Sequence, residues 1–367
     1  MRTVSHDNPV SEEKKSLVDK INSYYLITRK SHEMLNGKGR MPLTNTPEVR
    51  RHAYNSLRNK GINVPDEFLE SKIFDMTTLD KVTGWNLFWS LEMEAIASAI
   101  AYGGGTYERH LPARFLHYDL NAHRLASLVG EHNIKTKKFL ELGCGSALTL
   151  TRLAQKGADV TGLDSAVMAL EFAKYLADSY WVSSKVKLVE GDYFHTGLRD
   201  NEFDVTFNSG VAEHLNQQEF NYLLQEMIRV TKPGGYIVMA VPNENSTFYQ
   251  RFKKRQQEIK DDYPNLVEIP VEQIRHEHDI ERLMNEASLQ VDKKNAIDGI
   301  LVAPSTRIHQ SDILDEDVYT FDRYLPRNPR LSVETKVAIW RGLELMSNPD
   351  FRIRYGWTKY YVGRKPK

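Results

Sequence analysis

The sequence predicts an α/β fold: a doubly wound, mostly parallel sheet of seven strands, preceded by a helical extension. Three observations lead to this fold class. From about residue 116 onward, short apolar runs alternate with segments of helical spacing. Before that point the patterns are helical and no strand-like run occurs. One apolar run, 139–142, leads directly into a glycine turn and then a helical pattern, as expected at the carboxyl edge of a parallel sheet.

Composition narrows the class of protein. The 367 residues suffice for one large or two medium domains, and 41% of them are hydrophobic. The 49 basic and 49 acidic side chains cancel, which argues against a general nucleic-acid binder. Cys144 is the only cysteine, which excludes an intramolecular disulfide and a cysteine-based metal cluster. Neither a signal peptide nor a membrane-length apolar run is visible, so we expect a cytoplasmic protein without membrane contact.

Helical spacing dominates residues 1–115. An amphipathic pattern covers 11–27, and Thr46-Pro47 is a helix start that Gly61 ends. A third, strongly apolar helix is expected at 85–101, closed by the glycines 103–105. We expect these residues to form a helical cap over the substrate side. Their aromatic residues favour core or lid packing over a substrate cage; they are Trp85, Trp89, Tyr102 and Tyr107.

The remaining residues, 116–367, are expected to form the sheet domain. Its strands are predicted at 139–142, 160–164, 186–190, 203–208, 236–241, 289–297 and 356–364. Helices are predicted at 148–156, 167–181, 218–230 and 272–286. Ser165 is the expected cap of the second of these helices, and 232–235 is expected to be a turn. An insertion at about 300–353 separates the last two strands.

The glycine turn distinguishes two classes of ligand. A dinucleotide-binding dehydrogenase needs a third glycine where this chain has Leu148. Glu141, just before the turn, would repel a pyrophosphate but suits a ligand with an amino group and a sulfonium. Asp164 ends the next strand, where a carboxylate can accept both hydroxyls of a ribose.

These residues resemble a known family. The Glu-x-Gly-x-Gly pattern at 141–145 resembles motif I of the class I S-adenosylmethionine-dependent methyltransferases. Three further segments are similar to the family's motif IV, its turn before strand five and its last strand; they are 203–215, 229–236 and 356–364. The resemblance covers about 116–300 and 354–366. It implies the strand order 3-2-1-4-5-7-6 with strand seven antiparallel, and S-adenosyl-L-methionine as cofactor.

The resemblance also implies roles for residues around the turn. Gly143, Cys144 and Gly145 would contact the cofactor, with Cys144 a small turn residue rather than a nucleophile. Glu141 would bind the methionine amino group or brace the turn. Asp164 would bind the ribose, the alternative being an acid that stabilises a helix start.

Further cofactor contacts are expected at the ends of the next strands. Ser165 would line the adenine edge, and Asp192 would accept the adenine amine or act as a turn residue. Tyr193 would stack on adenine or pack in the core. Asn208 and Ser209, at the end of the fourth strand, would lie near the transferred methyl group.

His214 is the candidate catalytic base, because imidazole titrates near neutrality; a structural histidine is the alternative. Glu213, His276 and His278 are candidate substrate contacts, although a solvated helix start is the favoured alternative for His276 and His278. No metal is expected. The basic run 251–255 favours a solvated helix face over an anionic-substrate patch.

The function expected is therefore methyl transfer from S-adenosylmethionine to oxygen, nitrogen or carbon of a small molecule. Two alternatives stay open: a methyltransferase acting on RNA or protein, and a non-catalytic scaffold with the same fold. The oligomeric state is not predicted.

Overall fold

A computed structural model describes most of the sheet domain and part of the helical extension. The described residues are 47–70, 78–102, 106–246, 249–250, 277–291, 298–300, 342, 344, 346–348, 350–352 and 356–367. The predicted helix at 11–27, the glycines 103–105, the basic run 251–255 and most of the insertion lie outside them.

The sheet has the order β3-β2-β1-β4-β5-β8-β6, with β7 also paired to β8. Its strands are β1 (Lys138–Leu142), β2 (Asp159–Asp164), β3 (Val186–Glu190), β4 (Phe203–Ser209), β5 (Thr231–Pro242), β6 (Gln290–Val291), β7 (Asp298–Ile300) and β8 (Thr358–Arg364). Strands β1 to β5 pair in parallel, whereas β8 is antiparallel to β5. The α/β class and the predicted order are confirmed, with β8 as the seventh strand of the prediction.

Two details of the sheet differ from the prediction. The single strand expected at 289–297 is replaced by β6 and β7, which pair with opposite ends of β8, so the described part of the sheet has eight strands. The turn expected at 232–235 lies within β5. There the register with β4 passes from Phe203↔Thr231 to Val205↔Tyr236, so residues of β5 bulge from the strand and Gly234 takes a φ of 77°.

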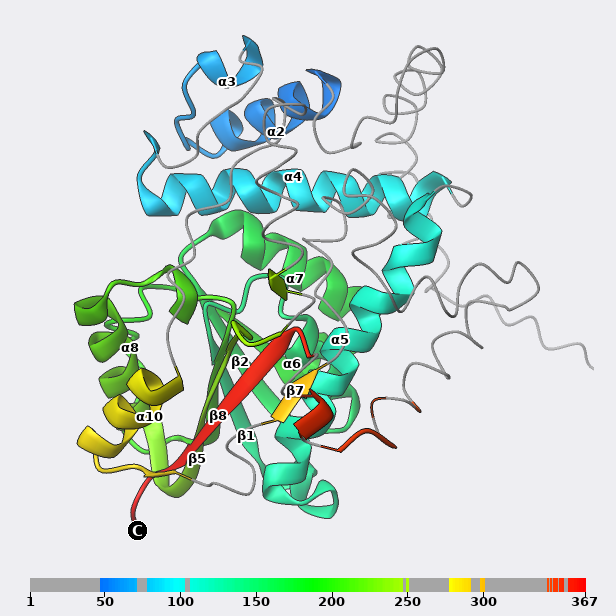
Figure 1. Ribbon diagram of the computed structural model, residues 1–367. Helices are drawn as coiled ribbons and strands as arrows, with labels where there is room; N and C mark the ends of the chain where they lie inside the picture. The colour runs from blue at the N-terminus through cyan, green and yellow to red at the C-terminus, as the bar shows by residue number, and fades with distance from the viewer. Residues whose placement is uncertain are drawn as a thin grey trace, which may run out of the picture.

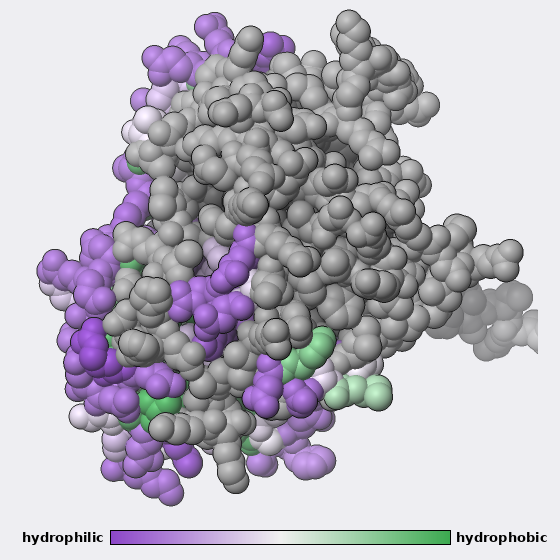
Figure 2. Space-filling view, viewed as in Figure 1, coloured by the Kyte–Doolittle hydropathy of each residue, from purple (hydrophilic) through white to green (hydrophobic). Residues whose placement is uncertain are grey.

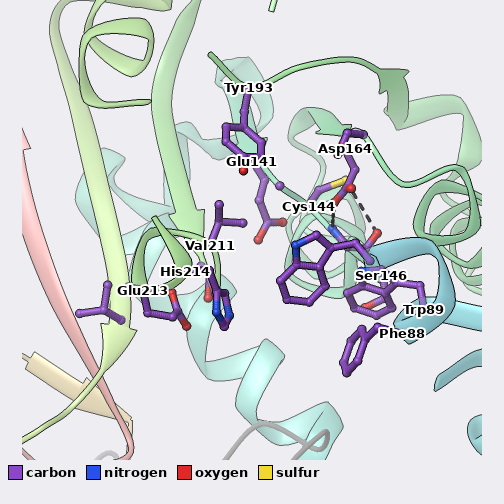
Figure 3. A pocket seen from close by; sticks show the side chains of 18 of the residues that line it. Phe88, Trp89, Glu141, Cys144, Ser146, Asp164, Tyr193, Val211, Glu213 and His214 are labelled. Atoms are coloured by element: carbon purple, nitrogen blue, oxygen red, sulfur yellow. Dashed lines mark hydrogen bonds between the residues drawn. The ribbon is translucent and has the colours of Figure 1, made fainter. Parts of the chain in front are cut away.

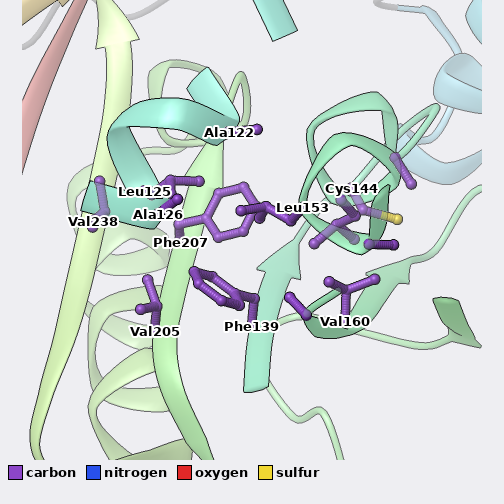
Figure 4. Close-up of a cluster of buried hydrophobic side chains, with 14 of the residues drawn as sticks. Ala122, Leu125, Ala126, Phe139, Cys144, Leu153, Val160, Val205, Phe207 and Val238 are labelled. Carbon is purple, nitrogen blue, oxygen red and sulfur yellow. The ribbon is translucent and has the colours of Figure 1, made fainter. Parts of the chain in front are cut away.

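Helices cover both faces of the sheet (Figure 1). On one face, α5 (Thr106–Val129) and α6 (Leu148–Gln155) pack on alternate strand residues such as Phe139 and Phe207 (Figure 4). On the other face, α8 (Gln217–Val230) and α10 (Glu277–Glu286) cover the intervening residues, Leu140 among them. This alternation is the period-two pattern of a strand buried on both faces.

The helical extension packs on α7 (Val167–Ser179) at one end of the sheet (Figure 1). It comprises α2 (Pro47–Asn59), α3 (Glu67–Glu70) and α4 (Lys81–Tyr102). Their buried side chains form one cluster that also includes Met168 of α7. The division expected at 115/116 falls inside α5, so no break in secondary structure marks it.

The expected helix cap at Ser165 is wrong. The N-cap residue of α7 is Ala166, which has no side chain that can cap, so the first turn of α7 obtains no cap from its own N-cap residue. The adjacent carboxylate of Asp164 accepts a hydrogen bond from the Ala166 N–H at 2.9 Å. A sequence rule that assigns the cap to a nearby serine misses this use of the preceding acid.

The described surface on the face shown in Figure 2 is mainly hydrophilic, with small hydrophobic patches. No helix in the described ranges is both long and apolar enough to cross a membrane.

Candidate active site

A pocket of about 370 Å³ lies at the carboxyl ends of β1, β2 and β4. Its walls include most of the residues that the sequence singled out: Glu141, Gly143, Cys144, Gly145, Asp164, Ser165, Tyr193, Ser209, Glu213 and His214. The sheet positions them together because parallel strands end at the same edge. Asp192 and Asn208 are not among its lining residues.

The turn after β1 is held tightly against β2. The N–H groups of Gly143 and Cys144 both donate to the carbonyl oxygen of Leu163, at 2.8 and 3.0 Å. Gly143 and Gly145 adopt φ values of 71° and 49°, which favour glycine. A Cβ atom at Gly143 would lie 2.2 Å from Cγ2 of Val211, so this turn also lacks room for a side chain.

Asp164 is the centre of this turn. It is only 9% exposed, and its two carboxylate oxygens accept from Gly145 N at 2.8 Å and from Ala166 N at 2.9 Å. Burial raises its pKa, against the effect of these backbone hydrogen bonds. The carboxylate therefore fixes the turn, and the remaining lone pairs of its oxygens are not used by these two bonds.

Glu141 points into the same pocket from inside β1 (Figure 3). Its side chain is 4% exposed, and Oε2 has no hydrogen-bond partner in the described part of the chain. Burial, and then the charge of Asp164, raise the pKa of Glu141 well above its ordinary value. A buried carboxylate oxygen without a donor is costly, and a cationic ligand at this position would remove that cost.

Cys144 has the environment of an unreactive thiol. It is buried, and Sγ lies 3.8 Å from the carbonyl oxygen of Gly145. Burial, followed by the charges of Asp164 and Glu141, raises its pKa well above the ordinary value. Because the thiolate is the nucleophile, this setting favours a small turn residue, as the sequence indicated.

Two predicted cofactor residues have other contacts. Asn208 is fully buried; its Nδ2 donates to Leu142 O at 2.6 Å, and its Oδ1 accepts from Ala212 N at 3.1 Å. It therefore joins β1 to the segment that carries His214 instead of facing the pocket. Asp192 is exposed, and its Oδ1 accepts from Phe194 N at 2.8 Å, which is the turn geometry given as its alternative.

Tyr193 and Ser209 both line the pocket, the first from the segment after β3 and the second from the end of β4. Burial, and then the charge of Glu219, raise the pKa of the Tyr193 hydroxyl, which stays protonated. The Tyr193 ring also stands edge-on to Phe194, with centroids 4.6 Å apart. The ring can thus line the pocket and pack against a neighbour at once.

His214 and Glu213 enter the pocket from a short 3₁₀ turn, Ala212–His214, after β4 (Figure 3). His214 is half-buried, and its ring meets Trp85 of α4 with centroids 5.1 Å apart and planes at 67°. Glu213 is 6% exposed. The candidate base thus lies between the sheet domain and the helical extension.

Helix α4 supplies a wall of this pocket, which sequence reasoning missed. Trp85, Phe88 and Trp89 all line it, as do His117 and Tyr118 of α5. The two tryptophans were expected in core or lid packing, and here they pack and line the pocket together. The strongly apolar character of 85–101 was the available signal, because a helix covering a sheet end buries aromatic residues there.

The two remaining candidate histidines belong to the segment 276–278. His276 lies outside the described residues, and His278 belongs to α10, whose described residues do not line the pocket. Among the described residues, no three His, Cys, Asp or Glu side chains are grouped as a metal site.

The pocket fits S-adenosylmethionine. Glu141 has a buried oxygen that bonds none of the described residues and would suit an amino group, and Asp164 has acceptor capacity that would suit ribose hydroxyls. Both acids have raised pKa values, so a positively charged ligand would favour their ionised forms. Sheet order and glycine turn together define a class I methyltransferase fold.

Comparison with known proteins gives the same result. Residues 140–239 match the family described as "Methyltransferase domain". The ubiquinone biosynthesis O-methyltransferase of Maricaulis maris is 33% identical over 127 residues, which are 32% of this chain and 46% of that protein. The norajmaline N-methyltransferase of Rauvolfia serpentina is 29% identical over 117 residues, 32% of this chain and 39% of that protein.

The chain thus spans about half the length of the relatives it matches or less. Among solved structures, a SAM-dependent methyltransferase from Archaeoglobus fulgidus is similar with a TM-score of 0.37 and 17% identity, over 68% of this chain and 94% of that one. A likeness of this size bears on neither substrate nor mechanism.

Proposed function

We propose that this protein transfers a methyl group from S-adenosylmethionine to an oxygen, nitrogen or carbon atom of a small molecule. The observation that carries the proposal is the buried Oε2 of Glu141, which bonds none of the described residues and shares one pocket with Asp164 and the glycine turn. An uncompensated carboxylate at this depth has a ready use in binding a cation.

When bound, S-adenosylmethionine would supply a methyl group activated by its sulfonium. Glu141 would hold the amino group, and Asp164 the ribose hydroxyls. Trp85, Phe88 and Trp89 would exclude water from the pocket, which strengthens the charge interactions within it. His214 would take a proton from the acceptor where the acceptor atom carries one.

A small acceptor is supported by the enclosing position of α4 and by the names of the relatives, which act in ubiquinone biosynthesis and on norajmaline. The position of α4 at the pocket also supports the proposal that residues 1–115 form a cap on the substrate side. We propose that the acceptor is neither nucleic acid nor protein. We also propose that the enzyme acts in the cytoplasm and does not bind a membrane.

Calorimetry with S-adenosylhomocysteine tests the cofactor, with NAD⁺ as the contrasting ligand. We expect the first to bind and the second not to bind. Screening phenols and secondary amines for methylated product and S-adenosylhomocysteine release then tests the reaction. Binding of NAD⁺ alone would exclude the proposal, and cofactor binding without turnover on any acceptor class would favour a scaffold.

The cap is tested by Trp85→Ala. Because Trp85 contacts the His214 ring, its loss should raise KM for the acceptor about tenfold while the Kd of S-adenosylhomocysteine changes by less than about threefold. An unchanged KM would place acceptor recognition elsewhere.

A further inference from the structure

The first turn of α7 is capped by a side chain from a distant part of the chain. Its N-cap residue, Ala166, provides no side-chain acceptor. The N–H of Met168 instead donates to Oδ1 of Asn86, at 3.0 Å, across 82 positions of sequence. Asn86 belongs to α4, so the helical extension satisfies one of the N–H groups that a helix start leaves without an intrahelical partner.

Asn86 is fixed in this role by its second contact and its burial. Its Nδ2 donates to Val82 O at 2.9 Å, one turn earlier in α4, and the residue is 2% exposed. The orientation of the amide follows from its partners, because only Oδ1 can accept from an N–H and only Nδ2 can donate to a carbonyl. Leu87, the neighbour of Asn86 in the chain, and Met168 are both fully buried in one cluster.

The residues between β2 and α7 are consequently held by three hydrogen bonds. Asp164 accepts from Gly145 N and Ala166 N, and Asn86 accepts from Met168 N two residues further on. The first two bonds place the carboxylate against the glycine turn. The third fixes the helix start that follows, so a loss of Asn86 would let Ala166 and then Asp164 move.

We propose that Asn86 is a positioning residue for the cofactor: through Met168 it holds the segment that carries Asp164 in the geometry that binds the ribose. The inference rests on the proposed function. It makes docking of α4 and binding of the cofactor mutually dependent, since any coupling between two binding events is reciprocal. Asn86 itself does not line the pocket.

The test uses the full chain and S-adenosylhomocysteine, with Kd measured by calorimetry. Asn86→Ala should weaken binding by several-fold, up to about 30-fold, the range expected from loss of a helix cap. Asn86→Asp keeps an acceptor oxygen and should bind within about threefold of the wild type. Ser90→Ala is the matched control: Ser90 lies one turn further on in α4, is 1% exposed, and its Oγ bonds none of the described residues.

A rescue variant separates positioning from general stability. Ala166→Ser places a hydroxyl at the N-cap of α7, where it can accept from the first-turn N–H groups without Asn86. Combined with Asn86→Ala, it should restore affinity and slow amide exchange at residues 166–168. The double variant also allows the test if Asn86→Ala alone does not fold, because the hydroxyl introduced at position 166 replaces the missing acceptor of Asn86.

Three outcomes would overturn the inference. Asn86→Ala could bind like the wild type although exchange at residues 166–168 is faster; the cap would then be structural only. Asn86→Asp could bind S-adenosylhomocysteine as weakly as Asn86→Ala, or the rescue variant could fail to recover the affinity. The shape of the Asn86 side chain, rather than its acceptor oxygen, would then matter. A wild-type chain that binds no S-adenosylhomocysteine would instead overturn the proposed function, and this inference with it.

Discussion

Trp89 of α4 lies directly against the backbone of Gly145 in the glycine turn. A Cβ atom on Gly145 would come within 2.2 Å of Cζ2 of the Trp89 ring. The helical extension thus reaches the centre of the glycine turn as well as the rim of the pocket. Two features therefore restrict position 145 to glycine: this contact and the φ of 49°.

Gly145→Ala should consequently weaken S-adenosylhomocysteine binding at least about tenfold and lower the Tm. The methyl group meets an indole that is itself packed, and crowding in a well-packed site typically costs about 1–3 kcal/mol. Gly197→Ala is the control, since Gly197 has a φ of 66° but no described atom within 4 Å of where its Cβ would lie. A similar effect at both positions would assign the loss to backbone strain alone.

Asp164→Ala should impair both binding and folding. The substitution leaves the N–H groups of Gly145 and Ala166 without their acceptor, and each such buried loss costs about 1–3 kcal/mol. The sequence alone does not reveal these two bonds. Asp164→Asn, which keeps one oxygen, should unfold at an intermediate urea concentration. Equal stability of both variants and the wild type would contradict a bracing role.

Cofactor binding should release a proton from Glu141. Its pKa is raised in the folded protein, so below that raised pKa the carboxyl holds a proton that a bound amino group would displace. Affinity should therefore rise with pH through the raised pKa and level off above it. Calorimetry in buffers of different ionisation enthalpy measures the protons released. Glu141→Gln should bind more weakly and without this release, and an unaltered release in that variant would point to Asp164.

The acid stability of the fold should depend on Glu226, far from the pocket. Burial opposes its ionisation, but hydrogen bonds from Arg229 and Thr196 hold the pKa of Glu226 at about 2. For an acid with a lowered pKa, the stabilisation is present above the ordinary value of 4.5 and disappears as pH falls toward about 2.

Glu226→Gln should lower the urea midpoint at neutral pH and reduce its dependence on pH within that window. Asp159→Asn is a suitable control, because Asp159 pairs with Lys185 on the surface, where its side chain is 58% exposed. A variant that keeps the wild-type pH profile would show that other carboxylates govern acid unfolding.

Sequence patterns sufficed for the sheet and for the pocket's acids because both are local. An apolar strand, a glycine turn and an acid at the next strand end are read within a few residues, as with Glu141 and Asp164. Local sequence patterns did not predict contacts between segments that are distant in the chain. Nothing near Asn86 indicates that it caps α7, and nothing near Asn208 indicates that it bonds Leu142 instead of facing the cofactor. The boundary expected at 115/116 falls within α5, whose packing against α6 is another contact that local patterns do not reveal.

His214 carries the last prediction, because the pocket places its ring against Trp85 beside the expected transfer point. If the acceptor atom carries a proton, His214→Ala should lower kcat by about 10²-fold or more while the Kd of S-adenosylhomocysteine stays within a few-fold. The pH–rate profile should lose an ascending limb near the imidazole pKa, since only the neutral ring can take the proton. His214→Phe keeps a ring against Trp85 and is the matched variant for packing. Recovery of stability but not of kcat in His214→Phe would identify a base, whereas recovery of both would leave His214 a packing residue and require another proton acceptor.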